Sequence, residues 1–193
     1  MKLDNLQVYN LENAVRASKF PMSFDTNNTK DNITDTTILL GKADPGTGHD
    51  NFLQGILVSF DLTCTNKMWV EFERYHFADI VSSQSTMHRI ARLTESDCFN
   101  DYVTSTIKNE IAKLRIKYNE TQDKEDYLTL LYNIPSGIEL TAQVVTNYRQ
   151  LKTMVIQRKD HRLPEWREFC KIICELPHFT ELTGVDITKV VLD

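Results

Sequence analysis

The sequence predicts an α+β fold, and two features of its hydrophobic pattern support that class. Apolar and polar residues alternate over 56–63, which is typical of a strand with one buried face. Helical periodicity then dominates the C-terminal half, whereas strands and helices that alternated along the chain would indicate βαβ units. With 193 residues and no repeat or obvious linker, the chain is expected to form a single domain over 1–193, two small domains being the alternative.

The expected elements follow from the same pattern. Residues 21–51, rich in Asn, Asp, Thr and Gly, predict a loop with one short strand at Thr37–Leu40. A strand over 56–63 is followed by a helix over 66–78, which Thr65 or Asn66 would cap. Helices are then expected over 100–119, over 122–133, over 137–159 and from Pro164 onward.

Composition excludes several classes of protein. A formal net charge of -5 argues against a general nucleic-acid binder, which is normally basic. No apolar run approaches the ~20 residues of a membrane span, and the first residues lack a signal-peptide core, so we expect a cytoplasmic protein without membrane contact. The four cysteines form no CxxC pair and no histidine spacing completes a zinc pattern, so no metal site is expected.

Hydrogen-bond donors are concentrated in the segment 71–89, directly after apolar residues. Donors gathered beside a core commonly bind an anionic ligand such as a nucleotide. The alternative is a solvated loop whose serines cap the next helix. The donors are Arg74, His76, Ser82, Ser83, Gln84, Ser85, His88 and Arg89.

A second basic region follows, with seven Lys or Arg against three acidic residues between positions 149 and 171. Such a patch in an acidic protein favours a specific anion over a polyanion. Asn147 and Arg158 would share one face of the expected helix, about 16 Å apart along its axis, while Arg149 would point to the opposite side. An extended ligand or a site between subunits could use all three; the alternative is that the arginines form surface ion pairs.

Three motifs together resemble the flavin-dependent thymidylate synthases, the ThyX family. The segment 48–53 (GHDNFL) is similar to the family's Gly-His segment, and Arg74-Tyr75-His76 with Ser85 is similar to its R-H-R-x-x-S-x-N-E-x-S-x-R-Y signature. Asn147-x-Arg149 followed by Arg158 reproduces its N-x-R-x8-R spacing. The signature's second and third residues are Tyr75 and His76 in this chain.

The resemblance implies a ThyX-like α+β fold with a central antiparallel sheet, and a homotetramer that binds FAD between subunits. It implies an enzyme that reductively methylates dUMP, or a related pyrimidine nucleotide, with methylenetetrahydrofolate and NADPH as co-substrates. Catalysis would depend on the flavin rather than on a protein nucleophile. The alternatives are a catalytically silent nucleotide- or flavin-binding protein, acting as a sponge or regulator, and a structural oligomer.

Site residues are carried over at the positions that match the motifs. The FAD contacts implied are Arg74, His76, Asn147, Arg149 and His49. For the nucleotide, Ser85 and Arg158 match, and Glu71 stands where the family often has Gln. Arg89 could supply the guanidinium of a displaced signature arginine, and Gln84 is the donor beside Ser85, which completes the expected nucleotide-binding set.

Overall fold

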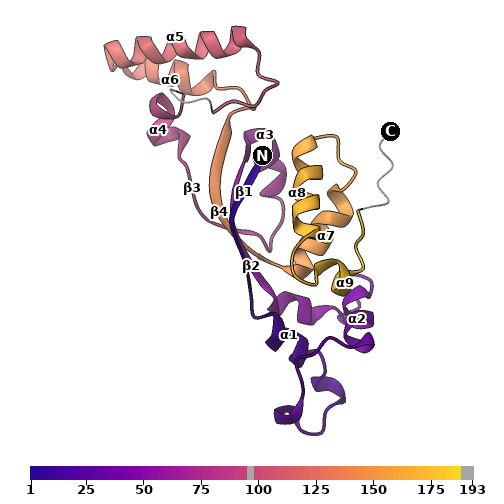
Figure 1. The fold of residues 1–193 in the computed structure, drawn as a ribbon. Helices are drawn as coiled ribbons and strands as arrows, with labels where there is room; N and C mark the ends of the chain where they lie inside the picture. The colour runs from indigo at the N-terminus through magenta and orange to yellow at the C-terminus, as the bar shows by residue number, and fades with distance from the viewer. Residues whose placement is uncertain (95–97, 188–193) are drawn as a thin grey trace.

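A four-stranded antiparallel sheet is the frame of the protein (Figure 1). The computed structural model describes residues 1–94 and 98–187. The strands lie in the order β1 (Lys2–Tyr9), β2 (Leu57–Thr65), β4 (Glu139–Asn147) and β3 (Asp79–Ser83), and each neighbouring pair is antiparallel. The predicted α+β class with a central antiparallel sheet is confirmed.

The β2–β4 pair forms the centre of the sheet. Nine residues of each strand pair in continuous register, from Leu57 opposite Asn147 to Thr65 opposite Glu139. Alternate residues of β2 are fully buried, including Val58 and Phe60, whereas the residues between them remain partly or fully exposed. The period of two predicted over 56–63 therefore reflects one covered and one open face.

Helices cover one face and both ends of the sheet (Figure 1). Helices α7 (Tyr148–Arg158) and α8 (Pro164–Cys174) pack with α3 (Asn66–Phe72) over the buried face. Helices α4 (Thr86–Leu93), α5 (Ser105–Thr121) and α6 (Lys124–Tyr132) lie at one end. At the other end lie α1 (Leu11–Ala17), α2 (Asp35–Lys42), α9 (Phe179–Thr183) and three 3-10 turns, η1 (Phe20–Met22), η2 (Thr26–Asn28) and η3 (Asn51–Gly55).

Two apolar clusters stabilise this arrangement. The main core joins the buried faces of β2 and β4 to α3, α7 and α8, with Trp166 and Phe72 stacked at 5.9 Å between ring centroids. A smaller cluster around Ile111 and Leu130 holds α4, α5 and α6 together. Trp69 and Trp166 are both buried and pack in the main core.

The prediction of one helix over 137–159 is wrong, because its first part is strand β4. Ala142, Val144 and Thr146 alternate inward against β2, and the main-chain direction changes only at Asn147. The Asn147 side chain caps α7 by accepting a hydrogen bond from the Gln150 N–H. Pairing with a preformed neighbour strand overrides the helical spacing that the apolar residues also allow.

Other boundaries also differ. The predicted strand at Thr37–Leu40 is part of helix α2, whose first turn is capped by Thr34 through a hydrogen bond from the Thr37 N–H. The helix predicted over 66–78 ends at Phe72, and the one predicted over 100–119 begins at Ser105. Strands β1 and β3 were not predicted. The helices predicted over 122–133 and from Pro164 are confirmed as α6 and α8.

Replacement of Gly41 by Ala is expected to destabilise the protein. Alanine normally favours a helix over glycine. A Cβ at position 41 would collide with the main-chain oxygen of Leu182, so α2 and α9 would have to separate. We expect the free energy of unfolding to fall by about 1–3 kcal/mol in chemical denaturation. Gly55→Ala is the control, since its Cβ would lie 3.3 Å from the Ala14 Cβ and require only a small shift. A Gly41→Ala protein at least as stable as wild type would contradict this packing.

Candidate functional site

The N-terminal end of α7 carries two of the predicted cofactor-binding residues, Asn147 and Arg149. Asn147 ends β4 and caps the helix, so its side chain is fixed by the Gln150 N–H at 2.9 Å. Arg149 lies in the first turn and places its Nε 3.0 Å from Oδ1 of Asp50. The Asp50 carboxylate is 1% exposed and also lies 3.5 Å from Nζ of Lys152.

A small hollow of about 190 Å³ lies beside these residues. Arg149 is 28% exposed and lines the hollow, so its guanidinium lies between the buried Asp50 and an open cavity. Because Asn147 and Arg149 share this cavity, the structure brings together two of the five predicted cofactor contacts. The lining residues are Pro45, Gln54, Phe77, Asn147, Arg149, Gln150 and Thr153.

Arg74 and His76 lie on the exposed turn that follows α3. This turn is fixed next to the hollow, since the main-chain oxygen of Phe77 accepts a hydrogen bond of 2.7 Å from Thr146 Oγ1 and Phe77 lines the cavity. Arg74 and His76 therefore lie within three positions of Phe77, which forms one wall of the hollow. Both side chains are exposed, so a ligand that extends out of the hollow could contact them.

The C-terminal end of α7 carries a separate polar cluster, which is centred on Glu71. The Glu71 carboxylate accepts hydrogen bonds of 3.1 Å from both Arg158 Nη1 and Trp166 Nε1. His161 Nε2 lies 3.2 Å and Lys67 Nζ 3.4 Å from the same carboxylate. The structure thus brings together Glu71 and Arg158, two of the predicted nucleotide contacts, as partners of each other.

Arg158 is held from several directions. Its Nε donates a 2.9 Å hydrogen bond to the hydroxyl of Tyr75, and its guanidinium lies 4.9 Å from the Trp166 ring centroid. Only 16% of the side chain is exposed. The sequence alternative of ion-paired arginines is therefore correct for the geometry, although the pairs are largely buried rather than on the surface.

The pKa values of this cluster are shifted by its surroundings. Burial alone would raise the pKa of Glu71, but the hydrogen bond from Trp166 and the neighbouring cationic groups outweigh it and lower the pKa. Burial lowers the pKa of His161, against the opposing effect of Glu71. His161 Nδ1 accepts a hydrogen bond from the Leu163 N–H at 3.2 Å, which only a ring unprotonated at Nδ1 can do.

The third group of predicted residues lies where β3 leads into α4. Gln84 pairs with Thr141 through its main-chain N–H and its side-chain oxygen, both at 2.9 Å. Ser85 caps α4 by accepting a hydrogen bond from the His88 N–H, as the alternative interpretation of this segment proposed. Arg89 is exposed one turn further on.

His49 lies in a different place, on the wall of a cavity of about 1020 Å³. The cavity is bounded by α1, α2, η3 and the segment between them, and its lining is mostly apolar. Lys19 and Lys30 line it and no acidic residue does, so it favours an apolar ligand with an anionic group. Lys19 itself is engaged with main-chain oxygens of Lys30 and Asn32.

Within one chain the predicted residues do not form a single site. Gln84 pairs with Thr141, and Asn147 lies six positions further along β4, which corresponds to about 20 Å. Sequence reasoning did not select Asp50, Lys152 or His161 as site residues. The i, i+3 spacing of Arg149 and Lys152 was a signal that two cations share one side of α7 and require an acidic partner.

Two other kinds of site were sought in the described part of the chain. Over residues 1–94 and 98–187, no cluster of three or more His, Cys, Asp or Glu has the geometry to hold a metal ion. In the same ranges no helix has the length and apolar character to cross a bilayer.

Comparison with known proteins identifies the fold. No family model and no curated protein matches the sequence. Two crystal structures of the flavin-dependent thymidylate synthase ThyX from Helicobacter pylori, both with FAD and dUMP, match the structure. One has a TM-score of 0.74 at 17% identity and covers 95% of this chain and 99% of its own. The other has a TM-score of 0.76 at 16% identity and covers 98% and 100%.

The sheet and its helices therefore define the chain as an α+β protein of a known fold. That fold is the one of the ThyX thymidylate synthases, which the chain shares at a sequence identity of 16–17% to these two structures.

Replacement of Glu71 by Gln is expected to destabilise the protein. The change leaves the Arg158 guanidinium largely buried without a counter-charge. We expect the free energy of unfolding to fall by about 2–3 kcal/mol, measured by urea denaturation. Glu73→Gln is the matched control, because Glu73 is exposed and should change stability by no more than about 0.5 kcal/mol. Equal changes in the free energy of unfolding for the two variants would mean that the Glu71–Arg158 pair does not contribute to stability.

The cluster also predicts how stability depends on pH. His161 has a folded pKa below its ordinary 6.5, so the unfolded chain binds its proton first and stability falls as pH decreases below about 6.5. Glu71 has a folded pKa below 4.5, so its contribution is present above 4.5 and is lost as pH falls through the lowered value. Urea denaturation across this range should give a flatter profile for His161→Gln near pH 6 and for Glu71→Gln below pH 4.5. If the stability of each variant changed with pH in parallel with wild type, neither His161 nor Glu71 would contribute to the pH dependence.

Proposed function

We propose that the chain is a divergent FAD-dependent thymidylate synthase that reductively methylates dUMP or a related pyrimidine nucleotide. The observation that carries the proposal is that the two ends of α7 hold two separate groups of polar side chains. On a fold shared with structures that contain FAD and dUMP, Asn147 and Arg149 line a hollow on one side of the helix, and Arg158 lies in a polar cluster on the other. The two arginines suit two different ligands.

The residues around the hollow fit a flavin cofactor. FAD, when bound, supplies the redox chemistry of the reaction. Arg149 offers its terminal nitrogens to an anionic diphosphate, and the exposed Arg74 and His76 add donors beside the hollow. Asn147 is already used as a helix cap, so its remaining amide N–H groups are the donors it can offer a ligand.

The nucleotide site is proposed to form between subunits of a homotetramer. The expected nucleotide contacts at the start of α4 lie about 20 Å from the hollow of their own chain; they are Gln84, Ser85 and Arg89. A partner chain would therefore have to bring its own copy of these residues to the flavin. Strand β3, at the edge of the sheet next to these residues, is exposed along its whole length and includes Ile80 and Val81. An apolar edge strand of this kind suits burial against a second copy.

Arg158 is proposed to contact the nucleotide from the Glu71 cluster. Two of its three nitrogens are already engaged by Glu71 and Tyr75, so one terminal nitrogen remains for a ligand. The negative charge of Glu71 also makes this end of α7 suitable for a neutral pyrimidine ring rather than for a phosphate.

The proposal for the folate co-substrate rests on the chemistry of the large cavity. Methylenetetrahydrofolate combines an apolar ring system with carboxylates, which suits the mostly apolar cavity lined by His49 and Lys30. NADPH is proposed as the source of reducing equivalents.

Two measurements on the purified protein test the proposal. We expect FAD to bind with a change in flavin fluorescence, and tritium to be released from 5-tritiated dUMP only when NADPH and methylenetetrahydrofolate are both present. Arg149→Ala should weaken FAD binding by about tenfold or more, through loss of a charge-assisted contact worth about 1.5–3 kcal/mol. Arg162→Ala, at an exposed arginine beyond the end of α7, is the control.

The outcomes separate the candidate functions. FAD binding without tritium release would favour the catalytically silent binding protein. Absence of both FAD binding and tritium release would reject the synthase and a silent flavin-binding protein, and a titration with dUMP would then test for a silent nucleotide-binding protein.

A further inference from the structure

We propose that Asp50 is a positioning residue of the flavin site, acting through Arg149. This inference rests on the proposed function, since it concerns how the cofactor-binding arginine is oriented. Asp50 follows His49 in the chain, and no motif of the sequence assigns it a role.

Asp50 cannot contact a ligand itself. Its side chain is 1% exposed, and its two carboxylate oxygens lie near two cations of the same helix turn. Oδ1 is 3.0 Å from Arg149 Nε, and Oδ2 is 3.5 Å from Lys152 Nζ. Any effect of Asp50 on a ligand must therefore pass through one of these two side chains.

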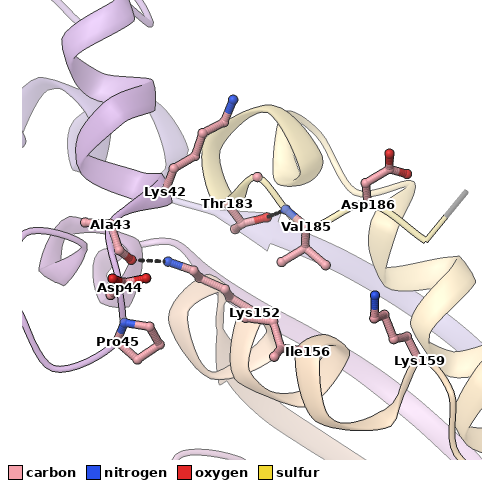
Figure 2. Close-up of a pocket in the computed structure, with 11 residues that line it drawn as sticks. Lys42, Ala43, Asp44, Pro45, Lys152, Ile156, Lys159, Thr183, Val185 and Asp186 are labelled. Atoms are coloured by element: carbon pink, nitrogen blue, oxygen red, sulfur yellow. Dashed lines mark hydrogen bonds between the residues drawn. The ribbon is translucent and has the colours of Figure 1, made fainter. Parts of the chain in front are cut away.

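Lys152 has enough partners without Asp50. Its Nζ donates to the main-chain oxygens of Gly41 at 2.9 Å and Ala43 at 2.7 Å, at the C-terminal end of α2, and the Ala43 contact is visible in Figure 2. These carbonyls end a helix, where a cation is favoured. Lys152 also donates a hydrogen bond of 3.5 Å to Asp50 Oδ2, whereas Asp50 Oδ1 accepts no hydrogen bond from the described residues and has Arg149 Nε 3.0 Å away. Asp50 therefore acts on Arg149 through its charge, as an ion pair.

Arg149 is held at one end of its guanidinium and open at the other. Asp50 Oδ1 lies 3.0 Å from Nε, and the guanidinium donates no hydrogen bond to any of the described residues, so its terminal nitrogens can donate to a ligand. The side chain lines the hollow next to Asn147. An arginine held through Nε alone presents its two terminal nitrogens as a fork, which matches the oxygens of a phosphate group.

Orientation before binding has a thermodynamic consequence. A free arginine side chain loses rotamer freedom when it binds a ligand, which weakens affinity. A guanidinium that is already fixed by a buried carboxylate loses less. Removal of Asp50 should therefore reduce cofactor affinity even though Asp50 does not touch the cofactor.

A double-mutant cycle tests this inference by fluorescence titration with FAD. We expect Asp50→Asn to weaken FAD binding by about tenfold, as loss of outer-shell partners commonly does. In the Arg149→Ala background, Asp50→Asn should cause little further loss, because the residue through which it acts is absent. Asp44→Asn is the matched control, an exposed carboxylate of the same segment, and should leave affinity unchanged. Wild-type affinity in Asp50→Asn, or equal losses in both backgrounds, would overturn the proposal.

A second measurement does not depend on FAD. In the wild-type protein, NMR relaxation of the Arg149 Nε–H group should show a well-ordered side chain, and Asp50→Asn should lower its order parameter. If FAD does not bind the wild type, the proposed function fails while this order parameter still tests whether Asp50 holds Arg149.

If Asp50→Asn does not fold, Asp50→Glu keeps the charge and should retain part of the Arg149 side-chain order and of the FAD affinity. A disordered Arg149 side chain in the wild type would overturn the inference by itself.

Discussion

The position of helix α7 depends on two carboxylates that contact it from opposite sides, the buried Asp50 and the partly buried Glu71. Asp50 faces Arg149 and Lys152 near the start of the helix, and Glu71 binds Arg158 at its end. The first connects α7 to α2 and to the segment that carries His49. The second connects α7 to α3 and α8. Because each charge is compensated inside the protein, a shift of α7 would expose an unpaired buried charge, which is costly.

The Glu71 cluster shows how an internal interaction can compete with a ligand. A carboxylate only accepts hydrogen bonds, so Glu71 can collect donors from α3, α7, α8 and His161 around one pair of oxygens. A glutamine at this position would have one acceptor oxygen and no charge. The acid therefore holds Arg158 more firmly and leaves it less free for a ligand. Tyr75 holds Arg158 as well.

How much the sequence could predict depended on whether local and tertiary signals agreed. Strand β2 was predictable because its alternation is long and one face is fully buried. Helix α8 was predictable because Pro164 sits in its first turn. Residues 139–147 have apolar spacing that suits either a strand or a helix, and the decision came from pairing with β2, which is distant in sequence. The short run Thr37–Leu40 was decided by the Thr34 cap.

The site shows the same limit. Motif spacing selected Arg149 and Arg158, but the carboxylates that orient them come from 99 and 87 positions away. Nine positions of helix amount to two and a half turns, which places the two arginines on opposite sides and about 14 Å apart along the axis. One compact ligand in one chain cannot contact both. Either two ligands bind on the two sides of α7, or a partner chain places its own copy of one of these arginines against the ligand. In both cases Asp50 and Glu71 determine which guanidinium nitrogens of Arg149 and Arg158 remain available to a ligand.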